Sequence, residues 1–296
     1  MATRPAALAV LALAVLVLPV LALTGGRAVA QPPIWIAHGP RSTLVLFGSA
    51  HLLPVGLNWE PPILAEVLSR ADQLWFELSV DQATDVLAAG LARARGALPP
   101  GEHLSATLTA DQAARLVRVI KALGVTQEAI ERMRPWLAEI TLSLAADERA
   151  GAVASQGVEQ QVEESAPASA GRHALETARQ QIDILAGAAP ADQISSLDET
   201  LNEIEEHPDS YRHVLAEWMA GDLAGLDADA LRPLRRASPT MYARLITRRN
   251  QRWAATIARR LAKPGVTVVI VGVGHLVGSG GVPALLRARG VRVEGP

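Results

Sequence analysis

Two apolar, strand-like segments near opposite ends of the chain each run into a Gly-x-x-His turn, and this pairing constrains the fold more than any other feature. The first segment is LVLFGSAH, ending at His51, and the second is VVIVGVGH, ending at His275. In open α/β sheets, ligands bind in the crevice outside the carboxyl ends of the strands. We therefore expect both ends of the chain to lie in one sheet, with the two histidines at a shared crevice.

The rest of the hydrophobic pattern alternates between strand-like and helical segments. β-Branched and apolar runs predict strands over residues 43–47, 73–79, 266–273 and 291–294. Longer periodic patterns predict helices over 61–71 and 109–123 and a mostly helical region over 192–261, while 164–171 is the most loop-like interior segment. The expected fold is α/β: a central mixed sheet with a thick helical layer, and N- and C-terminal strands in the same sheet.

Composition excludes several classes of protein. The chain has 296 residues, 49% of them hydrophobic, which is enough for one large core or two small ones. A net charge of −2, with both signs mixed along the chain, argues against a nucleic-acid partner. The absence of cysteine excludes disulfides, thiolate nucleophiles and zinc sites built on cysteine.

The first thirty residues have the pattern of a targeting segment. Arg4 precedes an apolar run over 6–23, and Ala28-Val29-Ala30 supplies a small-x-small cleavage site. This pattern predicts a secretory signal peptide over residues 1–30, and hence a protein that is exported to the periplasm or secreted. The alternative is an uncleaved membrane anchor, because the apolar run approaches the ~18 residues that span a bilayer. Membrane contact is expected only in that case.

Glycines in the two histidine turns suggest close approach of a ligand. Gly48, Gly272 and Gly274 lack the Cβ that would hinder such approach, so we expect them to border a bound cofactor. A dinucleotide fingerprint does not fit, because Gly278 falls one residue late. The alternative is a purely structural role, in which each histidine only packs within its turn.

Three polar residues interrupt segments that are otherwise expected to be buried. Glu77 lies near the end of the strand-like run LWFELSV, and Arg249 and Asn250 fall within the apolar stripe of a predicted helix over 240–261. An unpaired buried carboxylate is costly, so Glu77 is either an internal partner of an arginine or a metal ligand or general base. The alternative for Arg249 and Asn250 is a structural pairing, with Glu77 as one candidate partner.

These motifs, in this order, resemble the TraB/GumN family across nearly all of residues 31–296, which we expect to form a single domain of that type. The resemblance rests on GSAHLLP at 48–54, the strand carboxylate Glu77, the pair Arg249-Asn250 and the sequence GVGHL at 272–276. Gly157-Val158-Glu159 stands where the family usually has Gly-Val-Asp, and 174–177 (ALET) where it usually has Gly-Leu-Glu-Thr. Because of this second match, we include Glu176 among the candidate site residues.

The resemblance implies an α/β fold shared with erythromycin esterases and haem-binding ChaN-like proteins. The animal branch contains metal-dependent proteases that trim Wnt proteins, while bacterial members include one encoded in an exopolysaccharide cluster and one linked to pheromone shutdown. The substrate therefore does not follow from the family.

Both lines of reasoning together predict an exported metal-dependent hydrolase acting on a peptide or protein substrate. His51, Glu77 and His275 are the expected ligands of a divalent ion (Mn²⁺, Co²⁺ or Zn²⁺) that activates water. Arg249, Asn250 and Glu176 complete the expected catalytic residues, with Arg249 and Asn250 orienting the substrate or stabilising an oxyanion. The alternatives are a haem- or ligand-binding module without catalysis, and an accessory protein of envelope or polysaccharide assembly.

Overall fold

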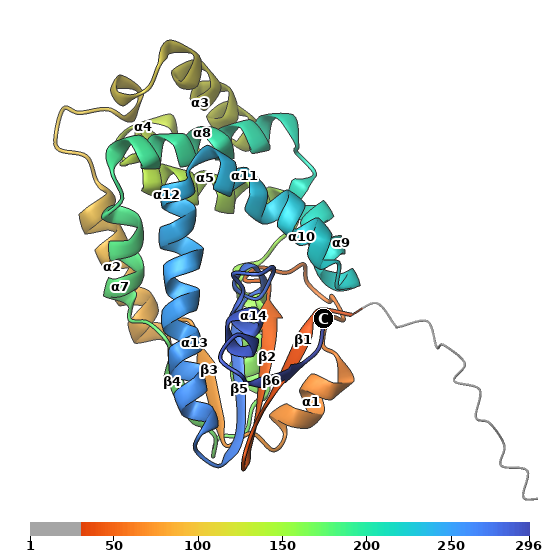
Figure 1. Ribbon diagram of the computed structural model, residues 1–296. Coiled ribbons are helices and arrows are strands. Elements are labelled where there is room, and N and C mark those ends of the chain that lie inside the picture. The colour runs from red at the N-terminus through yellow and green to blue at the C-terminus, as the bar shows by residue number, and fades with distance from the viewer. Residues whose placement is uncertain (1–30) are drawn as a thin grey trace, which may run out of the picture.

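A six-stranded mixed sheet forms the base of the molecule in this computed structural model, which describes residues 31–296 (Figure 1). The strand order is β4-β3-β5-β2-β1-β6, with β1 (Ile34–Gly39), β2 (Ser42–Ser49), β3 (Gln73–Phe76), β4 (Gly171–Ala174), β5 (Gly265–Gly272) and β6 (Arg292–Glu294). Strands β2, β5, β3 and β4 are parallel, and β1 runs antiparallel to both β2 and β6. The predicted α/β fold is confirmed, with strands from both ends of the chain in one sheet.

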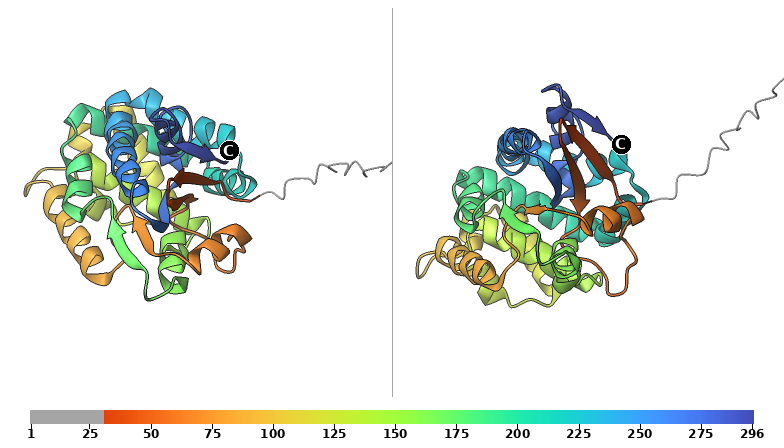
Figure 2. Two further views of the ribbon diagram at one scale, coloured as in Figure 1. Left: turned by 60° about the horizontal axis from the view of Figure 1, so that its bottom comes forward. Right: turned by 90° about the horizontal axis from the view of Figure 1, so that it is seen from below.

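Helices cover both faces of this sheet. On one face, α1 (Pro62–Leu68) and α6 (Val158–Ser165) pack against alternate residues of the central strands, including Phe47 and Ile270. On the other face, α13 (Arg248–Leu261) and α14 (Val282–Arg287) pack against Leu46 and Val269. Figure 2 shows α1 on the opposite side of the sheet from α13 and α14. Because successive strand residues point to opposite faces, β2 and β5 are apolar on both.

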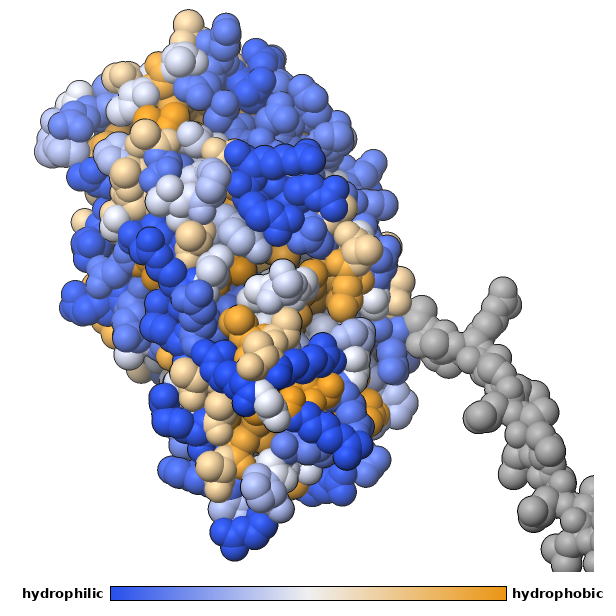
Figure 3. Space-filling view, in the orientation of Figure 1, coloured by the Kyte–Doolittle hydropathy of each residue, from blue (hydrophilic) through white to orange (hydrophobic). Residues whose placement is uncertain are grey.

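The remaining helices form a lobe beyond the carboxyl ends of the parallel strands (Figure 1). Its core contains residues of α3 (Ala110–Leu123), α4 (Gln127–Glu131), α5 (Pro135–Arg149) and α8 (Pro190–Glu206). Helices α2 (Gln82–Gly96) and α7 (Ala178–Ala186) pack beside each other. The chain then returns to the sheet through four helices: α9 (Ser210–Ala220), α10 (Leu223–Leu226), α11 (Arg232–Ala237) and α12 (Pro239–Tyr242). One face of the molecule is hydrophilic over most of this lobe (Figure 3).

Local sequence explains where several of these helices begin and end. Thr109 and Gln112 form a reciprocal capping box at the start of α3, and Gly124 ends that helix in a left-handed conformation. Asp81 caps α2 by accepting a hydrogen bond from the Thr84 N–H. Two π-helical turns, η3 (Asp227–Leu231) and η4 (Ala243–Thr247), interrupt the run from α10 to α13.

The predicted segments correspond to observed elements with a few differences. The strand predicted over 73–79 ends at Phe76, β1 and β4 were not predicted, and the region 192–261 is divided into shorter helices. The predicted signal peptide, residues 1–30, lies outside the described residues. Of the helices between residues 31 and 296, none has the length and apolar character needed to cross a bilayer.

Candidate functional site at the sheet edge

The two Gly-x-x-His turns lie side by side because their strands are hydrogen-bonded neighbours. Parallel strands β2 and β5 pair with Ser49 opposite Gly272, so both turns leave the sheet at the same edge. His51 follows β2, and His275 ends the short 3₁₀ turn η5 (Val273–His275) that follows β5. The expected convergence of the two turns is therefore present in the structure.

Glu77 joins this edge from the end of β3 and is held by one backbone group and one cation. Its Oε1 accepts a hydrogen bond from the Gly272 N–H at 2.7 Å, and its Oε2 accepts from Arg249 Nη2 at 2.5 Å. Burial by itself raises the pKa of Glu77, but the charges of His275, Arg249 and His51 outweigh burial and lower that pKa to about 2. Because His275 is neutral at pH 7, Arg249 and His51 are the cations that keep Glu77 ionised.

Arg249 stands at the centre of the cluster. Its Nε donates to Glu176 Oε2 at 3.0 Å, and its Nη1 lies 3.0 Å from His275 Nε2 and 3.1 Å from the Leu245 carbonyl oxygen. The side chain is buried, and the guanidinium packs over the Trp253 ring. The π-helical turn η4 ends at Thr247, two residues before Arg249, and such distortions are frequent at functional sites. The structural alternative for Arg249, pairing with Glu77, is observed.

The contacts of His275 assign its tautomer. A guanidinium only donates hydrogen bonds, so Nε2 accepts from Arg249 and the proton lies on Nδ1, which donates to Asn250 Oδ1 at 2.6 Å. The Asn250 amide in turn donates to the Gly280 carbonyl at 2.8 Å. Burial lowers the pKa of His275 to about 4. Asn250 therefore positions the imidazole.

His51 is in a different environment from His275. Its side chain is 58% exposed, and its Nδ1 lies 2.8 Å from Glu159 Oε1, which also accepts from the Ser49 hydroxyl at 2.5 Å. The Glu159 carboxylate raises the pKa of His51 to about 9. At neutral pH this pair is charged.

Glu159 was absent from the predicted site residues, although Gly157-Val158-Glu159 offered a sequence signal. A Cβ on Gly157 would lie 2.1 Å from the His51 carbonyl oxygen, so only glycine lets the start of α6 approach this turn. The Val158 N–H then donates to the Ala50 carbonyl at 3.1 Å. This close approach brings the Glu159 carboxylate to His51.

The three glycines expected to border a cofactor differ in surroundings. A Cβ on Gly272 would lie 3.0 Å from His51 Nε2 and 3.2 Å from Glu77 Oε1, so this glycine leaves space between two polar side chains. By contrast, a Cβ on Gly48 would contact Val273, and one on Gly274 would contact Leu231. Gly48 and Gly274 therefore serve close packing of apolar side chains.

Glu176 is buried behind Arg249 and has a second cation. Its Oε1 accepts from Arg252 Nη2 at 3.0 Å, and the Arg252 side chain is 55% exposed. Arg252 lies on the exposed face of α13, outside the buried stripe that includes Trp253 and Ile257. Because the arginine side chain is long, Arg252 reaches Glu176 from that face.

A pocket of about 300 Å³ opens beside the two turns. It is lined by His51, His275 and residues of α9 that include Leu215 and Trp218. A larger cavity, about 490 Å³, lies in the helical lobe, and Tyr211 lines both. We base the candidate site on the smaller pocket because both histidines line it, together with Gly272, whose N–H donates to Glu77.

The side chains at this edge meet some, but not all, of the requirements for binding a divalent ion. Each histidine has its Nδ1 engaged by a side-chain oxygen, the arrangement that commonly orients metal-bound imidazoles, and Gly272 leaves room between His51 Nε2 and Glu77 Oε1. However, His51, Glu77 and His275 do not bring their ligand atoms within 4.8 Å of one another. His275 Nε2 lies 3.7 Å from Glu77 Oε1, so the wider separation involves His51, and Arg249 already contacts Glu77 Oε2 and His275 Nε2.

Comparison with known proteins places the chain among relatives of similar length. It is 25% identical over 246 residues to the protein YbaP of Escherichia coli (strain K12), described as uncharacterized, covering 82% of this chain and 87% of YbaP. YbaP of Shigella flexneri matches to the same extent. No solved structure matches the chain. The family model of TraB/PrgY/gumN matches residues 33–295, and the chain belongs to that family.

Proposed function

We propose that the protein is an exported metal-dependent hydrolase with a peptide bond as its target. The observation that carries this proposal is the orientation of the two histidines: Glu159 and Asn250 engage their Nδ1 atoms, and Gly272 leaves open space between His51 Nε2 and Glu77. His51, Glu77 and His275 would hold the ion. When bound, such an ion lowers the pKa of a water molecule and polarises a carbonyl group.

The chain's own residues would orient the substrate and stabilise charge. Glu176 and the Leu245 carbonyl hold the Arg249 guanidinium in a fixed position, so its Nη2 is directed at the edge where Glu77 lies. A fixed, partly desolvated cation stabilises developing negative charge more than a mobile one in water. The apolar wall formed by Leu215 and Trp218 limits water in the pocket. Without an ion, His51 and Glu159 form a charged pair beside the pocket, so an ion bound at His51 Nε2 would displace a proton.

The test is metal binding and peptide hydrolysis measured together. Purified protein is offered Mn²⁺, Co²⁺ or Zn²⁺ and a mixed-sequence peptide library, with products read by mass spectrometry. His51→Ala should lose metal affinity and hydrolysis while keeping its fold, because the His51 side chain is 58% exposed. The matched control is His103→Ala, another exposed histidine, which should behave as wild type.

Other results would select the alternative functions. A haem absorption band in the purified protein would favour the ligand-binding module. Wild-type protein that neither binds these ions nor cleaves any peptide would favour the accessory role in envelope or polysaccharide assembly. Unchanged metal affinity in His51→Ala would exclude His51 as a ligand.

Export is a separate part of the proposal and rests on the sequence of residues 1–30. The Ala28-Val29-Ala30 site predicts a mature protein that begins at Gln31. N-terminal sequencing of protein recovered from the periplasm or the medium tests this directly. A first residue of Met1 or Ala2 would show that the segment is retained.

A further inference from the structure

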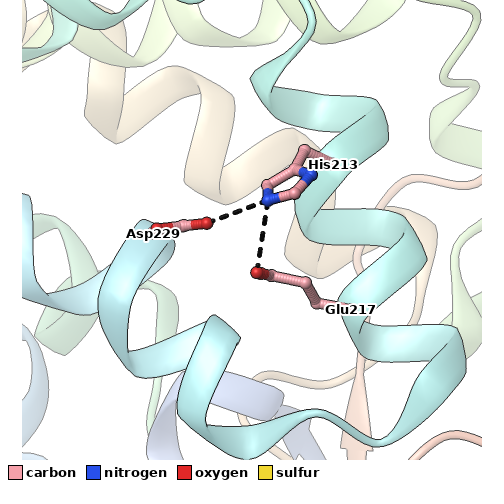
Figure 4. Close-up of side chains that lie close together, drawn as sticks. All are labelled: His213, Glu217 and Asp229. Atoms are coloured by element: carbon pink, nitrogen blue, oxygen red, sulfur yellow. Dashed lines mark ion pairs between the residues drawn. The ribbon is translucent and has the colours of Figure 1, made fainter.

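A second cluster of metal-ligating side chains lies on α9, in the helical lobe. His213 and Glu217 are one helical turn apart, and Asp229 approaches them from the π-helical turn η3 (Figure 4). His213 Nε2 lies 3.0 Å from Asp229 Oδ2 and 3.5 Å from Glu217 Oε1. Within residues 31–296, this group has its three candidate ligand atoms all within 4.8 Å of one another.

These separations match those of zinc ligands. Zinc binds nitrogen and oxygen at about 2.0–2.2 Å in tetrahedral sites, which places neighbouring ligand atoms roughly 3.3–3.6 Å apart. The two distances from His213 Nε2 to the carboxylates of Asp229 and Glu217 are close to that spacing.

An independent observation points to a missing ligand. Glu217 is only 9% exposed, and its Oε2 is buried with no hydrogen-bond partner in the described part of the chain. Buried carboxylate oxygens are normally paired, because an unpaired one costs free energy. The other oxygen of this carboxylate, Oε1, faces His213 Nε2 at 3.5 Å, so a cation bound between the two residues would neutralise the carboxylate that carries the unpartnered oxygen (Figure 4).

The charge around the cluster is negative and not compensated by arginine or lysine. Glu217, Asp229 and Asp222 lie together, and a Cβ on Gly225 would lie 2.3 Å from Glu217 Oε1 and 2.8 Å from Asp222 Oδ2. Over residues 31–296, no arginine or lysine lies within 4.0 Å of these three carboxylates; nearby Arg235 pairs with Asp227 instead. Such a site attracts a cation.

We propose that His213, Glu217 and Asp229 form a second divalent-metal site, selective for zinc-like ions over Mg²⁺, that joins α9 to η3. Imidazole favours zinc and its neighbours, whereas Mg²⁺ prefers sites made of oxygen ligands and water. Asp229 also lines the 490 Å³ cavity, so the ion would lie at its rim. The site does not depend on the sheet-edge proposal.

The test uses Zn²⁺ and separates the two sites. In a His51→Ala background, which weakens the sheet-edge site, isothermal titration should still detect one Zn²⁺ site, and Zn²⁺ should raise the unfolding temperature. Adding His213→Ala should weaken that binding at least ~10-fold, since loss of a supporting partner alone typically costs 10–100-fold. Adding His103→Ala instead should change nothing, and Mg²⁺ should not compete.

Several results would overturn the second site. These are no Zn²⁺ binding in the His51→Ala protein, an affinity reduced less than ~10-fold by His213→Ala, or equal binding of Mg²⁺. His213 is 65% exposed and Asp229 is 43% exposed, so both substitutions should leave the fold intact. If His213→Ala fails to fold, Asp229→Asn must give the same loss of Zn²⁺ binding, and normal binding in Asp229→Asn would refute the site.

Discussion

Buried carboxylates in the sheet edge and in the helical lobe have opposite pKa shifts, although burial acts on all of them in the same direction. At the sheet edge, the charges of His275, Arg249 and His51 lower the pKa of Glu77, and the charge of His51 together with hydrogen bonds lowers the pKa of Glu159. In the helical lobe, burial raises the pKa of Glu139 to about 7 and that of Asp147 to about 6. The presence of a neighbouring cation, not burial alone, decides the direction of the pKa shift.

This difference explains why the two candidate metal sites look unlike each other. The sheet edge carries its own cation, Arg249, which pairs with both Glu77 and Glu176. The α9 cluster has two carboxylates and a histidine but no arginine, and its donor atoms lie closer together. A side-chain cation and a metal ion are alternative ways to neutralise the same kind of site.

Removing the central cation should have the largest effect. Arg249→Met leaves Glu77 and Glu176 buried with one fewer partner each, and breaking a buried ion pair typically costs about 3–5 kcal/mol. We expect that loss in denaturant unfolding, together with loss of any hydrolysis. The control is Arg248→Met, at an exposed neighbouring position, which should change stability little. A loss below about 1 kcal/mol in Arg249→Met would show that the buried Glu77 and Glu176 do not depend on this cation.

In the helical lobe, the pH dependence of stability tests the opposite case, a carboxyl group whose pKa is raised by burial. Glu139 Oε1 accepts from the Ser196 hydroxyl at 2.7 Å, and its Oε2 is buried without a partner among the described residues. Because its folded pKa of about 7 exceeds the ordinary value of 4.5, the folded state holds the proton longer than the unfolded state. The free energy of unfolding should therefore fall as pH rises from about 4.5 to 7, by up to roughly 3 kcal/mol.

Glu139→Gln removes this titration. The variant should match wild type near pH 5 and exceed it by roughly 2 kcal/mol near pH 8, as measured by urea unfolding at each pH. Glu128→Gln, at an exposed helix position, controls for the loss of one carboxylate. Parallel pH curves for wild type and Glu139→Gln would show that Glu139 is neutralised in some other way.

A glycine substitution tests where an ion would lie at the sheet edge. A Cβ at Gly272 would come within 3.2 Å of both His51 Nε2 and Glu77 Oε1. Gly272→Ala should weaken metal binding about 10–100-fold, as displaced supporting groups do. At Gly280 a Cβ meets nothing within 4 Å, so Gly280→Ala is the matched control. Equal metal affinity in both variants would place the ion elsewhere.

The sequence predicted the sheet edge well because its signals are local. An apolar run followed by Gly-x-x-His indicates a strand and the turn after it, and two such runs imply neighbouring carboxyl ends. Glu77 and Arg249 stood out because a charge interrupts an apolar pattern. Their mutual contact was one alternative in the sequence, and only the packing of α13 on the sheet selects it.

The features that the sequence did not predict depend on contacts between distant segments. Glu159 reaches His51 because Gly157 allows α6 to approach the turn, and no periodic pattern reports that approach. His213 and Glu217 are spaced as on one helix face, but Asp229 joins them only through η3. Strand β4 has four residues and exposed positions, so its hydrophobic pattern is too short to recognise.

Removing the second cation that contacts Glu176, Arg252, should have the smallest effect. This variant compares an exposed arginine with the buried Arg249 at the same carboxylate. Arg252 donates to Glu176 Oε1 at 3.0 Å, yet its side chain is 55% exposed, whereas Arg249 is 9% exposed. Solvent screens the exposed pair, so Arg252→Met should cost no more than about 1 kcal/mol, and added salt should reduce that cost. Urea unfolding of both arginine variants at low and high salt measures the contrast. If Arg252→Met costs as much as Arg249→Met, then charge near Glu176, rather than the buried position of Arg249, determines the stability of this edge.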